Sequence, residues 1–330
     1  MRLRDGVLQA VRAFFATRGY VEVETPAIVS APGQESNLDL FRTRFVAGRD
    51  SRDLFLITSP EHHMKRLLGA GCGRIYQVCR SFRNGERSPH HSPEFTMLEW
   101  YRAWTGYEDL MLEVAELVAH VAVRVRRTTR LAYQGRPLEL RPPWRRLTVA
   151  EAFARFCGVD LLAHQDARSL CARLRQAGFA SVRPDDTYED AFHKGLIEGV
   201  EPALADLGAV ILHDYPAPLA ALARMSEADP RVAQRAEAYL AGVEIGNGFA
   251  ELGDPREQRR RFAAERQKLL RAGRPVPPLD RDFLAMLEAG MPPAVGMALG
   301  IDRLAMVLAD APSVDQVMAF PMSVPGGDDG

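Results

Sequence analysis

Residues 82–101 read FRNGERSPHHSPEFTMLEWY, and this stretch favours two antiparallel strands joined by a long loop. The loop is rich in turn-forming residues, and Arg83 lies where the first strand enters it. The returning strand carries Phe95, Glu99 and Tyr101. An arginine suits a phosphate, an aromatic side chain suits a flat ring, and carboxylates suit a cation. The stretch therefore predicts a hairpin that binds a ligand.

The composition is that of a globular enzyme. The 330 residues are 47% hydrophobic and 26% charged, which is enough to bury a large core. No apolar run approaches the ~18 residues that a membrane-spanning helix needs, so no such helix is expected. The formal net charge of −1 gives no bulk attraction to nucleic acid. The four cysteines include no Cys-x-x-Cys pair, so free thiols and a cytoplasmic location are expected.

The spacing of apolar residues predicts both helices and strands. Helices are expected at 5–18, 108–125, 255–272 and 280–289, and others are expected to begin at Ser59-Pro60-Glu61 and at Ile301. Strands are expected near 42–47, 54–57, 209–213, 217–225, 231–252 and 296–300. Residues 131–205 show only short helical segments and none of the motif chemistry, so we interpret them as an insertion. The hairpins and meanders predict an α+β fold with an antiparallel sheet flanked by helices.

A second motif lies near the end of the chain. Residues 296–308 read GMALGIDRLAMVL, in which Gly300 allows a ligand close to the backbone. Arg303 falls in the first turn of a helix, whose N-terminus favours anions. With GYVEVETP at 19–26 and the hairpin, these segments resemble the three-motif core of a class II aminoacyl-tRNA synthetase of the lysyl kind. The resemblance covers about 1–130 and 205–325, and it implies the class II catalytic fold and a homodimer.

The resemblance also implies an ATP site. Arg83 would hold the α-phosphate and the substrate carboxylate, Phe95 would stack on adenine, and Arg303 would contact the γ-phosphate. Arg83 and Arg303 are therefore the expected catalytic residues. The expected ATP-binding residues are Arg83, Asn84, Gly85, Glu86, Ser92, Phe95, Glu244, Ile245, Gly300 and Arg303. Because Mg²⁺ on a triphosphate uses one or two carboxylates, Glu237 and Glu244 are expected to bind it.

Several carboxylates are expected in one cleft with the hairpin. Glu61, Glu99 and Glu251 come from three separate segments. Carboxylates in one cleft repel each other unless a cation enters, so a ligand with two ammonium groups would explain them. The resemblance implies that Glu61 and Glu99 hold the α-amino group, and that Glu251 and Tyr101 hold the side-chain amine. The full set expected to bind the amino acid is Ser59, Pro60, Glu61, Glu99, Tyr101, Asn247, Glu251 and Ala298.

One branch of this family fits the whole chain better. Lysyl-tRNA synthetases of ordinary build carry an N-terminal anticodon-reading domain, whereas the first motif here begins within twenty residues. The pattern CRSFRN, EFTMLEWYR and GMALGIDRL is similar to the elongation factor P–(R)-β-lysine ligase family. This resemblance implies one catalytic domain over 1–330, with no binding of a tRNA anticodon. It also implies that (R)-β-lysine, or lysine, is activated with ATP and joined to a lysine of elongation factor P.

Two alternatives stay open at this point. One is a stand-alone lysyl-tRNA synthetase catalytic domain, and the other is a non-catalytic paralogue that senses an amino acid or nucleotide. The sequence also departs from the family pattern, because Gly85 stands where a glutamate is usual and His90 stands where an arginine is usual. Glu86 or the backbone would then contact adenine. These departures concern the affinity for the nucleotide more than the type of reaction.

Overall fold

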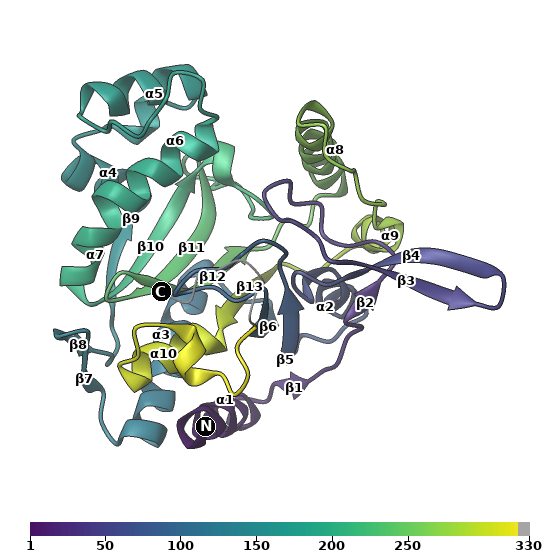
Figure 1. Ribbon diagram of the computed structural model, residues 1–330, viewed down its shortest axis with the longest axis horizontal. Helices are drawn as coiled ribbons and strands as arrows, with labels where there is room; N and C mark the ends of the chain where they lie inside the picture. The colour runs from purple at the N-terminus through teal and green to yellow at the C-terminus, as the bar shows by residue number, and fades with distance from the viewer. Residues whose placement is uncertain (323–330) are drawn as a thin grey trace. The chain divides into compact units, whose positions relative to one another are not determined.

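Two units make up the chain in the computed structural model, which describes residues 1–322. Unit 1 comprises Met1–Trp104, Gly253–Pro292 and the chain from Ala298 onward. Unit 2 comprises Thr105–Leu252 and Pro293–Met297 (Figure 1). Strand β13 (Ala294–Gly300) therefore begins in unit 2 and ends in unit 1.

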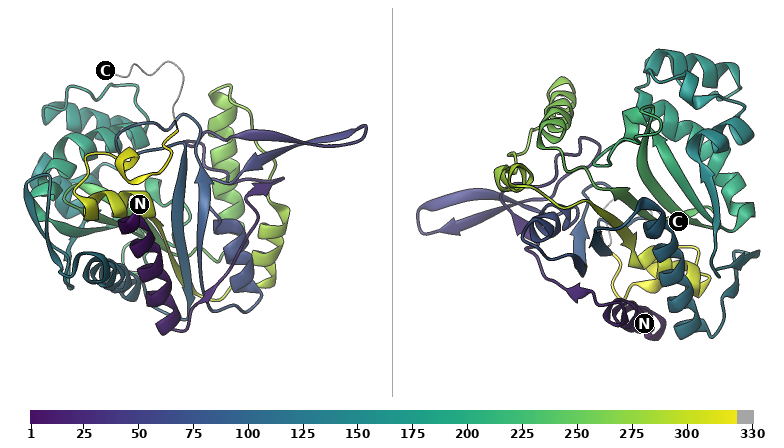
Figure 2. Two further views of the ribbon diagram at one scale, coloured as in Figure 1. Left: turned by 60° about the horizontal axis from the view of Figure 1, so that its bottom comes forward. Right: turned by 180° about the vertical axis from the view of Figure 1, so that it is seen from behind.

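The predicted hairpin is part of the sheet in unit 1. Strands β5 (Arg74–Phe82) and β6 (Glu94–Ala103) pair antiparallel, from Arg74 opposite Arg102 to Phe82 opposite Glu94, which confirms it. Strand β1 (Val21–Glu22) pairs parallel with β5. A second sheet has the order β2-β4-β3, with bounds Ile28–Val29, Asp50–Leu56 and Arg42–Ala47. The β3–β4 hairpin extends away from the rest of unit 1 (Figure 2).

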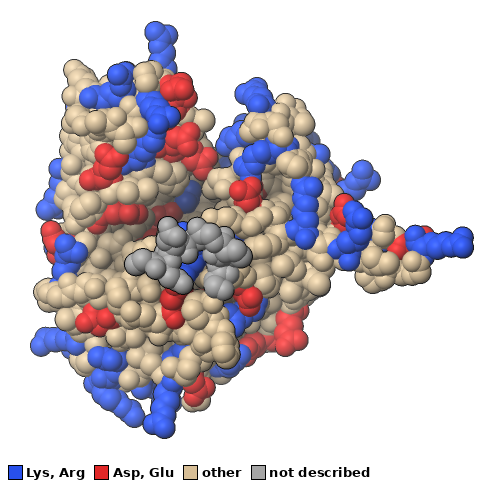
Figure 3. Space-filling model, in the orientation of Figure 1, with Lys and Arg blue, Asp and Glu red and all other residues tan. Residues whose placement is uncertain are grey.

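The helices of unit 1 are α1 (Arg2–Thr17), α2 (Glu61–Gly69), α8 (Pro255–Arg271), α9 (Arg281–Ala289), α10 (Ile301–Ala309) and the short η4 (Val314–Val317). Helix α1 buries Val7, Val11 and Phe14 at helical spacing. It packs against α10, which in turn packs against β6, while α2 packs against both β6 and α9. Basic side chains are exposed on α8 and on the β3–β4 hairpin (Figure 3). The contacts of α2 and α10 place both helices beside β6.

Unit 2 is built on β10 (Ala209–Pro216), β11 (Val232–Leu240) and β12 (Val243–Ala250), which pair antiparallel in that order. Strand β9 (Arg145–Thr148) pairs parallel with β10. Strands β7 (Arg130–Tyr133) and β8 (Arg136–Glu139) form a separate pair. The helical elements are α3 (Tyr107–Arg126), α4 (Val149–Cys157), η1 (Leu161–Ala163), α5 (Ala167–Gln176), α6 (Tyr188–Gly195), η2 (Leu196–Val200), α7 (Glu201–Leu207) and η3 (Ala217–Leu219).

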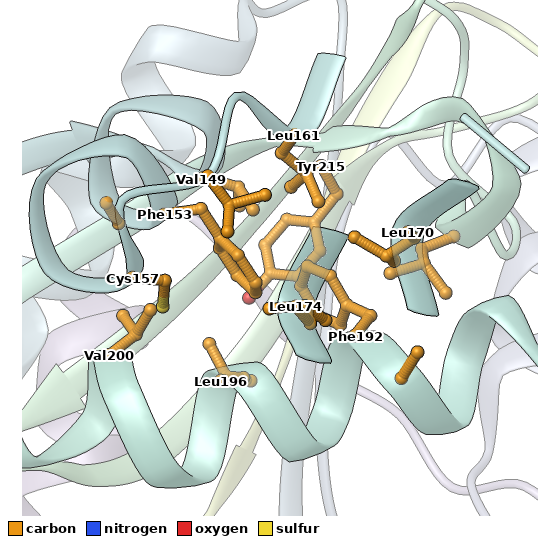
Figure 4. Close-up of a cluster of buried hydrophobic side chains, with 14 of the residues drawn as sticks. Val149, Phe153, Cys157, Leu161, Leu170, Leu174, Phe192, Leu196, Val200 and Tyr215 are labelled. Carbon is orange, nitrogen blue, oxygen red and sulfur yellow. The ribbon is translucent and has the colours of Figure 1, made fainter. Parts of the chain in front are cut away.

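The short helices of the expected insertion have a core of their own in unit 2. Phe153 of α4 stacks on Phe192 of α6, with ring centroids 5.0 Å apart. Leu174 and Leu196 join them, and Tyr215 of β10 completes the cluster (Figure 4). The helices of this segment thus present apolar side chains, at helical spacing, to one face of the strands. Burial of this apolar surface stabilises the segment. Within residues 1–322, no helix is long and apolar enough to cross a bilayer.

Three details of the predicted fold need correction. The sheet is mixed, because β1–β5 and β9–β10 are parallel pairs. The strand expected at 217–225 is wrong: the segment begins as the short helix η3, in which Pro218 has no amide hydrogen to donate to a strand ladder. Residues 131–205 were expected to form only short helical segments, yet they also contain strands β8 and β9. Helix α2 begins at Glu61, as expected, and the Ser59 hydroxyl accepts a hydrogen bond from the Glu61 amide at 3.3 Å.

Candidate active site

The loop between β5 and β6 is held by backbone hydrogen bonds. The Arg83 amide donates to the Pro93 carbonyl at 2.9 Å, and the Asn84 amide donates to the Asp39 carbonyl at 2.9 Å. Within the loop, Ser88 and His91 exchange two backbone hydrogen bonds of 3.2 and 3.1 Å. These bonds give the loop a defined backbone structure, and they fix the backbone of Arg83 at the start of the loop.

Arg83 has capacity for a further ligand. Its guanidinium carbon lies 5.3 Å from the centroid of the Phe95 ring, and its nearest ion pair is with Glu86 at 3.7 Å. Within residues 1–322, Arg83 Nε and the Ser92 hydroxyl are buried without a hydrogen-bond partner. Buried polar atoms normally have partners, so these two atoms point to a polar ligand. Arg83, Phe95, Glu86 and Ser92, all expected at an ATP site, lie on this loop and the start of β6.

Arg303 contacts the same loop from α10. Its Nε donates to the His90 carbonyl at 3.1 Å, and one terminal nitrogen lies 2.6 Å from His91 Nε2. Gly300 is the N-cap residue of α10, so Arg303 stands in the first turn as expected. Burial, and secondly the Arg303 charge, lower the pKa of His90, which favours the neutral ring. The two expected catalytic arginines thus bracket the loop from its two ends.

A buried ion pair that the sequence patterns do not predict lies beside Arg303. Asp302 accepts hydrogen bonds from the Arg4 guanidinium and from the Thr96 amide, the latter at 2.6 Å. Arg4 also donates to the Thr96 hydroxyl at 2.6 Å. These bonds join α1, β6 and α10, so they hold the start of α10 in place. The available signal was a charged residue, Arg4, on the otherwise apolar face that α1 buries.

The carboxylates of unit 1 lie at α2 and β6. Glu61 pairs with Lys65 at 2.5 Å, and the Lys65 side chain is buried. The Tyr101 hydroxyl donates to Glu99 at 2.5 Å. Burial, and secondly the nearby Glu99, raise the pKa of Cys79 to about 12, so this thiol is no nucleophile at neutral pH. Lys65 was not anticipated, although it lies one helical turn after Glu61 and partly neutralises it.

The expected site residues of unit 2 lie on β11, β12 and the segment after it. Both oxygens of Glu237 are engaged, one by Arg235 at 2.7 Å and the other by the Tyr239 hydroxyl at 2.8 Å. Arg235 Nε also donates to Asn247 at 3.3 Å. Glu244 is half-buried on β12. The Glu251 amide donates to the Ala294 carbonyl at 2.9 Å, which fixes Glu251 against β13.

The candidate residues therefore form two sets. The set of unit 2 is Glu237, Glu244, Ile245, Asn247 and Glu251. The set of unit 1 is Ser59, Pro60, Glu61, Arg83, Asn84, Gly85, Glu86, Ser92, Phe95, Glu99, Tyr101, Ala298, Gly300 and Arg303. Within these sets the structure shows local contacts, such as Arg235 with Glu237 and Asn247, and Tyr101 with Glu99. Their convergence on one ligand stays a prediction.

Sequence comparison identifies the class of protein. The profile of the family described as tRNA synthetases class II (D, K and N) matches residues 1–324, so the chain belongs to this family. It is 41% identical over 322 residues to the elongation factor P–(R)-β-lysine ligase of Klebsiella pneumoniae, a match covering 96% of this chain and 93% of that protein. Proteins of the same name from Erwinia tasmaniensis and Salmonella dublin are 42% and 41% identical over the same length and coverage. Within the class II synthetases, the chain belongs to this ligase family.

Proposed function

We propose that the protein is an ATP-dependent ligase that activates (R)-β-lysine and joins it to a lysine side chain of elongation factor P. The observation that carries the proposal is the 41% identity, over 96% of the chain, to ligases of that name. The loop of unit 1 supports the proposal. The guanidinium groups of Arg83 and Arg303, together with the adjacent ring of Phe95, suit a bent nucleoside triphosphate.

The reaction has two steps. A carboxylate oxygen of the amino acid attacks the α-phosphorus of ATP, and the bond to the pyrophosphate group breaks, which gives an adenylate. The ε-amino nitrogen of the acceptor lysine then attacks the acyl carbon, loses a proton and displaces AMP, which leaves an amide. Arg83 would hold the α-phosphate and Arg303 the γ-phosphate, so that catalysis consists mainly of positioning and charge neutralisation. Phe95 would stack on adenine, and Asn84, Gly85, Glu86, Ser92, Ile245 and Gly300 would complete the nucleotide site.

Magnesium fits the carboxylates of unit 2 in part. Its preferred ligands are oxygens, and Glu244 offers them, whereas Glu237 would have to exchange a hydrogen bond with Arg235 or Tyr239. In residues 1–322 no three His, Cys, Asp or Glu side chains form a ready metal site. Phosphate oxygens would therefore supply further ligands. Bound there, Mg²⁺ would neutralise charge on the phosphates.

The two amino groups of β-lysine would bind carboxylates. Glu61 and Glu99 would receive one, with Ser59 and Pro60 shaping the start of α2, and Glu251 with Tyr101 and Asn247 would receive the other. The proposal includes a cytoplasmic enzyme, as its four free cysteines suggest, and a homodimer by analogy with class II enzymes. Light scattering on the purified protein tests the dimer.

Mass spectrometry of elongation factor P tests the function directly. After incubation with the enzyme, ATP and (R)-β-lysine, we expect one lysine of elongation factor P to gain the mass of β-lysine minus water. Reactions without ATP provide the control. An unmodified elongation factor P, with enzyme that is folded by circular dichroism, would contradict the proposal.

A second candidate function follows from the family profile, which includes synthetases for lysyl-tRNA. A stand-alone lysyl-tRNA synthetase domain would attach lysine to tRNA instead of to a protein. Charging of tRNALys with labelled lysine separates the two readings. A non-catalytic sensor, the third reading, would show no ATP–pyrophosphate exchange with either lysine isomer.

Ala298 is expected to influence the choice between lysine isomers. It is partly exposed on β13, where lysyl-tRNA synthetases resembling this chain tend to have glycine. Removing its methyl group would enlarge the proposed pocket, and one methyl group is worth about 10–200-fold in discrimination. We therefore expect Ala298→Gly to raise exchange with α-lysine relative to β-lysine by roughly 10-fold. An unchanged ratio of kcat/KM for the two isomers would show that Ala298 does not set the specificity.

A further inference from the structure

Glu35 lies outside the expected site residues, in the segment between β2 and β3. It lines a cavity of about 370 Å³ whose wall is entirely within unit 1. Asn84, from the loop that begins at Arg83, lines the same cavity, as do Asp39, Arg42 and Arg274. A space of this size with several polar side chains accommodates part of a small ligand. Glu35 is therefore adjacent to the candidate nucleotide loop.

The residues on either side of Glu35 fix its backbone. The Gln34 side-chain amide donates to the carbonyls of Pro32 and Pro278 at 3.1 and 3.0 Å. The Ser36 amide donates to Glu265 of α8 at 3.1 Å. Arg274 donates to the Ser36 carbonyl as well. These neighbours hold the segment through contacts in which the Glu35 carboxylate takes no part.

The Glu35 carboxylate lies back over Gly33. A Cβ atom added at Gly33 would clash with Glu35 Oε2, so the carboxylate occupies the space that a side chain there would fill. Within residues 1–322, Glu35 forms no ion pair. A carboxylate in a cavity wall without a cation partner is unusual, because burying a charge is costly unless it is paired.

The electrostatic surroundings of Glu35 are those of the candidate site. Burial, and secondly the Glu61 charge, raise the pKa of Glu35, while His62 and Arg83 oppose the rise. The Nδ1 atom of buried His62 lies 3.2 Å from Asp280, and its Nε2 atom has no hydrogen-bond partner within residues 1–322. The carboxyl is thus held toward its neutral form beside the groups proposed to bind the amino acid and the α-phosphate. A cation entering the site would favour the charged form and release the proton.

We propose that Glu35 binds the ammonium group of a primary amine in this site, because its carboxylate lines the cavity next to Asn84, has no cation partner in unit 1, and lies near Glu61 and Arg83. The inference rests on the proposed function, in which two sources supply such a group. One is an amino group of β-lysine. The other is the ε-ammonium of the acceptor lysine, whose proton must leave before its nitrogen attacks. In that case the ionised Glu35 carboxylate accepts this proton, and the neutral amine forms the amide.

The substitution Glu35→Gln keeps the shape of the side chain and removes its charge. If the amine is that of β-lysine, the KM for β-lysine in ATP–pyrophosphate exchange rises about 30-fold or more. If the amine is that of the acceptor, exchange is normal, and single-turnover transfer from preformed adenylate to elongation factor P slows by a similar factor. Either result supports the inference and identifies the source.

The pH dependence provides a readout that a purely structural role would not change. Binding of the amine releases the proton of Glu35. The wild-type constant that depends on Glu35, either the KM for β-lysine or the rate of transfer, therefore improves as pH rises through the raised pKa of Glu35. Glu35→Gln has no such proton, so this dependence disappears. Glu265→Gln, which loosens the same segment through Ser36, is the matched control and keeps the wild-type pH profile. Gly33→Ala provides a second test, since its methyl group displaces the Glu35 carboxylate and should reproduce part of the loss.

One result would overturn the inference and leave the proposed function standing. In that result, Glu35→Gln has the same KM for β-lysine, the same transfer rate and the same pH profile as the wild type. A loss shared equally by Glu265→Gln and Glu35→Gln, with the pH dependence kept in both, would also overturn it, since it would show a structural effect. A wild-type enzyme that neither exchanges pyrophosphate with β-lysine nor modifies elongation factor P would overturn the proposed function and this inference together.

Discussion

Replacing Arg83 with alanine should lower the rate of ATP–pyrophosphate exchange by about 10²–10³-fold, the usual loss when one preorganised donor to a developing charge is removed. Arg83 is proposed to hold the α-phosphate, where negative charge is redistributed as the bond to pyrophosphate breaks. Its Nε is buried and has no hydrogen-bond partner within residues 1–322, which supports the proposed role toward a ligand. Arg83→Lys should recover only part of the rate, because an ammonium lacks the planar pair of donors.

Arg80→Ala is the matched control for this measurement. Arg80 lies on β5, three residues before Arg83, and its ion pair with Glu94 is 3.5 Å long with both side chains substantially exposed. Its removal should change exchange by less than about 3-fold, since an exposed pair contributes only ~0–1 kcal/mol. Equal losses in the two variants would mean that Arg83 acts through general charge on the strand and not as a phosphate ligand.

Replacing Arg4 with leucine should destabilise the protein by about 3–5 kcal/mol. The change leaves the Asp302 carboxylate buried without its cation, because the Asp302 side chain is only 4% exposed. The penalty arises from desolvation of an unpaired charge, and the hydrogen bond from the Thr96 amide offsets only part of it. Equilibrium unfolding in urea measures the loss as a shift of the midpoint.

Arg12→Leu is the comparison on the same helix. Arg12 pairs with Glu22 at 3.1 Å, but the two side chains are 50% and 38% exposed. Water and salt screen such a pair, so its loss should cost no more than about 1 kcal/mol. If both leucine variants unfold at the same urea concentration, the Arg4–Asp302 pair does not hold α10 as described.

Much of the fold could be predicted because its signals are local. The alternation of apolar residues around Arg83 predicted β5, β6 and the loop between them, and the structure confirms their pairing. The helices at α1, α3, α8 and α9 begin and end within a few residues of the predicted bounds. The errors arose where pairing between distant strands decides the outcome. Parallel partners for β5 and β10 leave no mark in the sequence of either strand, and Pro216 and Pro218 end β10 despite the apolar pattern that follows.

Arg83, Phe95, Glu99 and Arg303 were predicted as site residues from short motifs and from the resemblance of those motifs to a known family, and their roles stay predictions. The buried ion pair of Arg4, the burial of Lys65 and the position of Glu35 in a cavity wall were decided only by tertiary structure. Each of these residues acquires its significance from burial next to a group far away in the chain or on another turn, such as Asp302, nearly 300 residues after Arg4. Burial lowers the local dielectric, so the same charge that is inconsequential in water becomes a strong interaction once the fold has removed it from solvent.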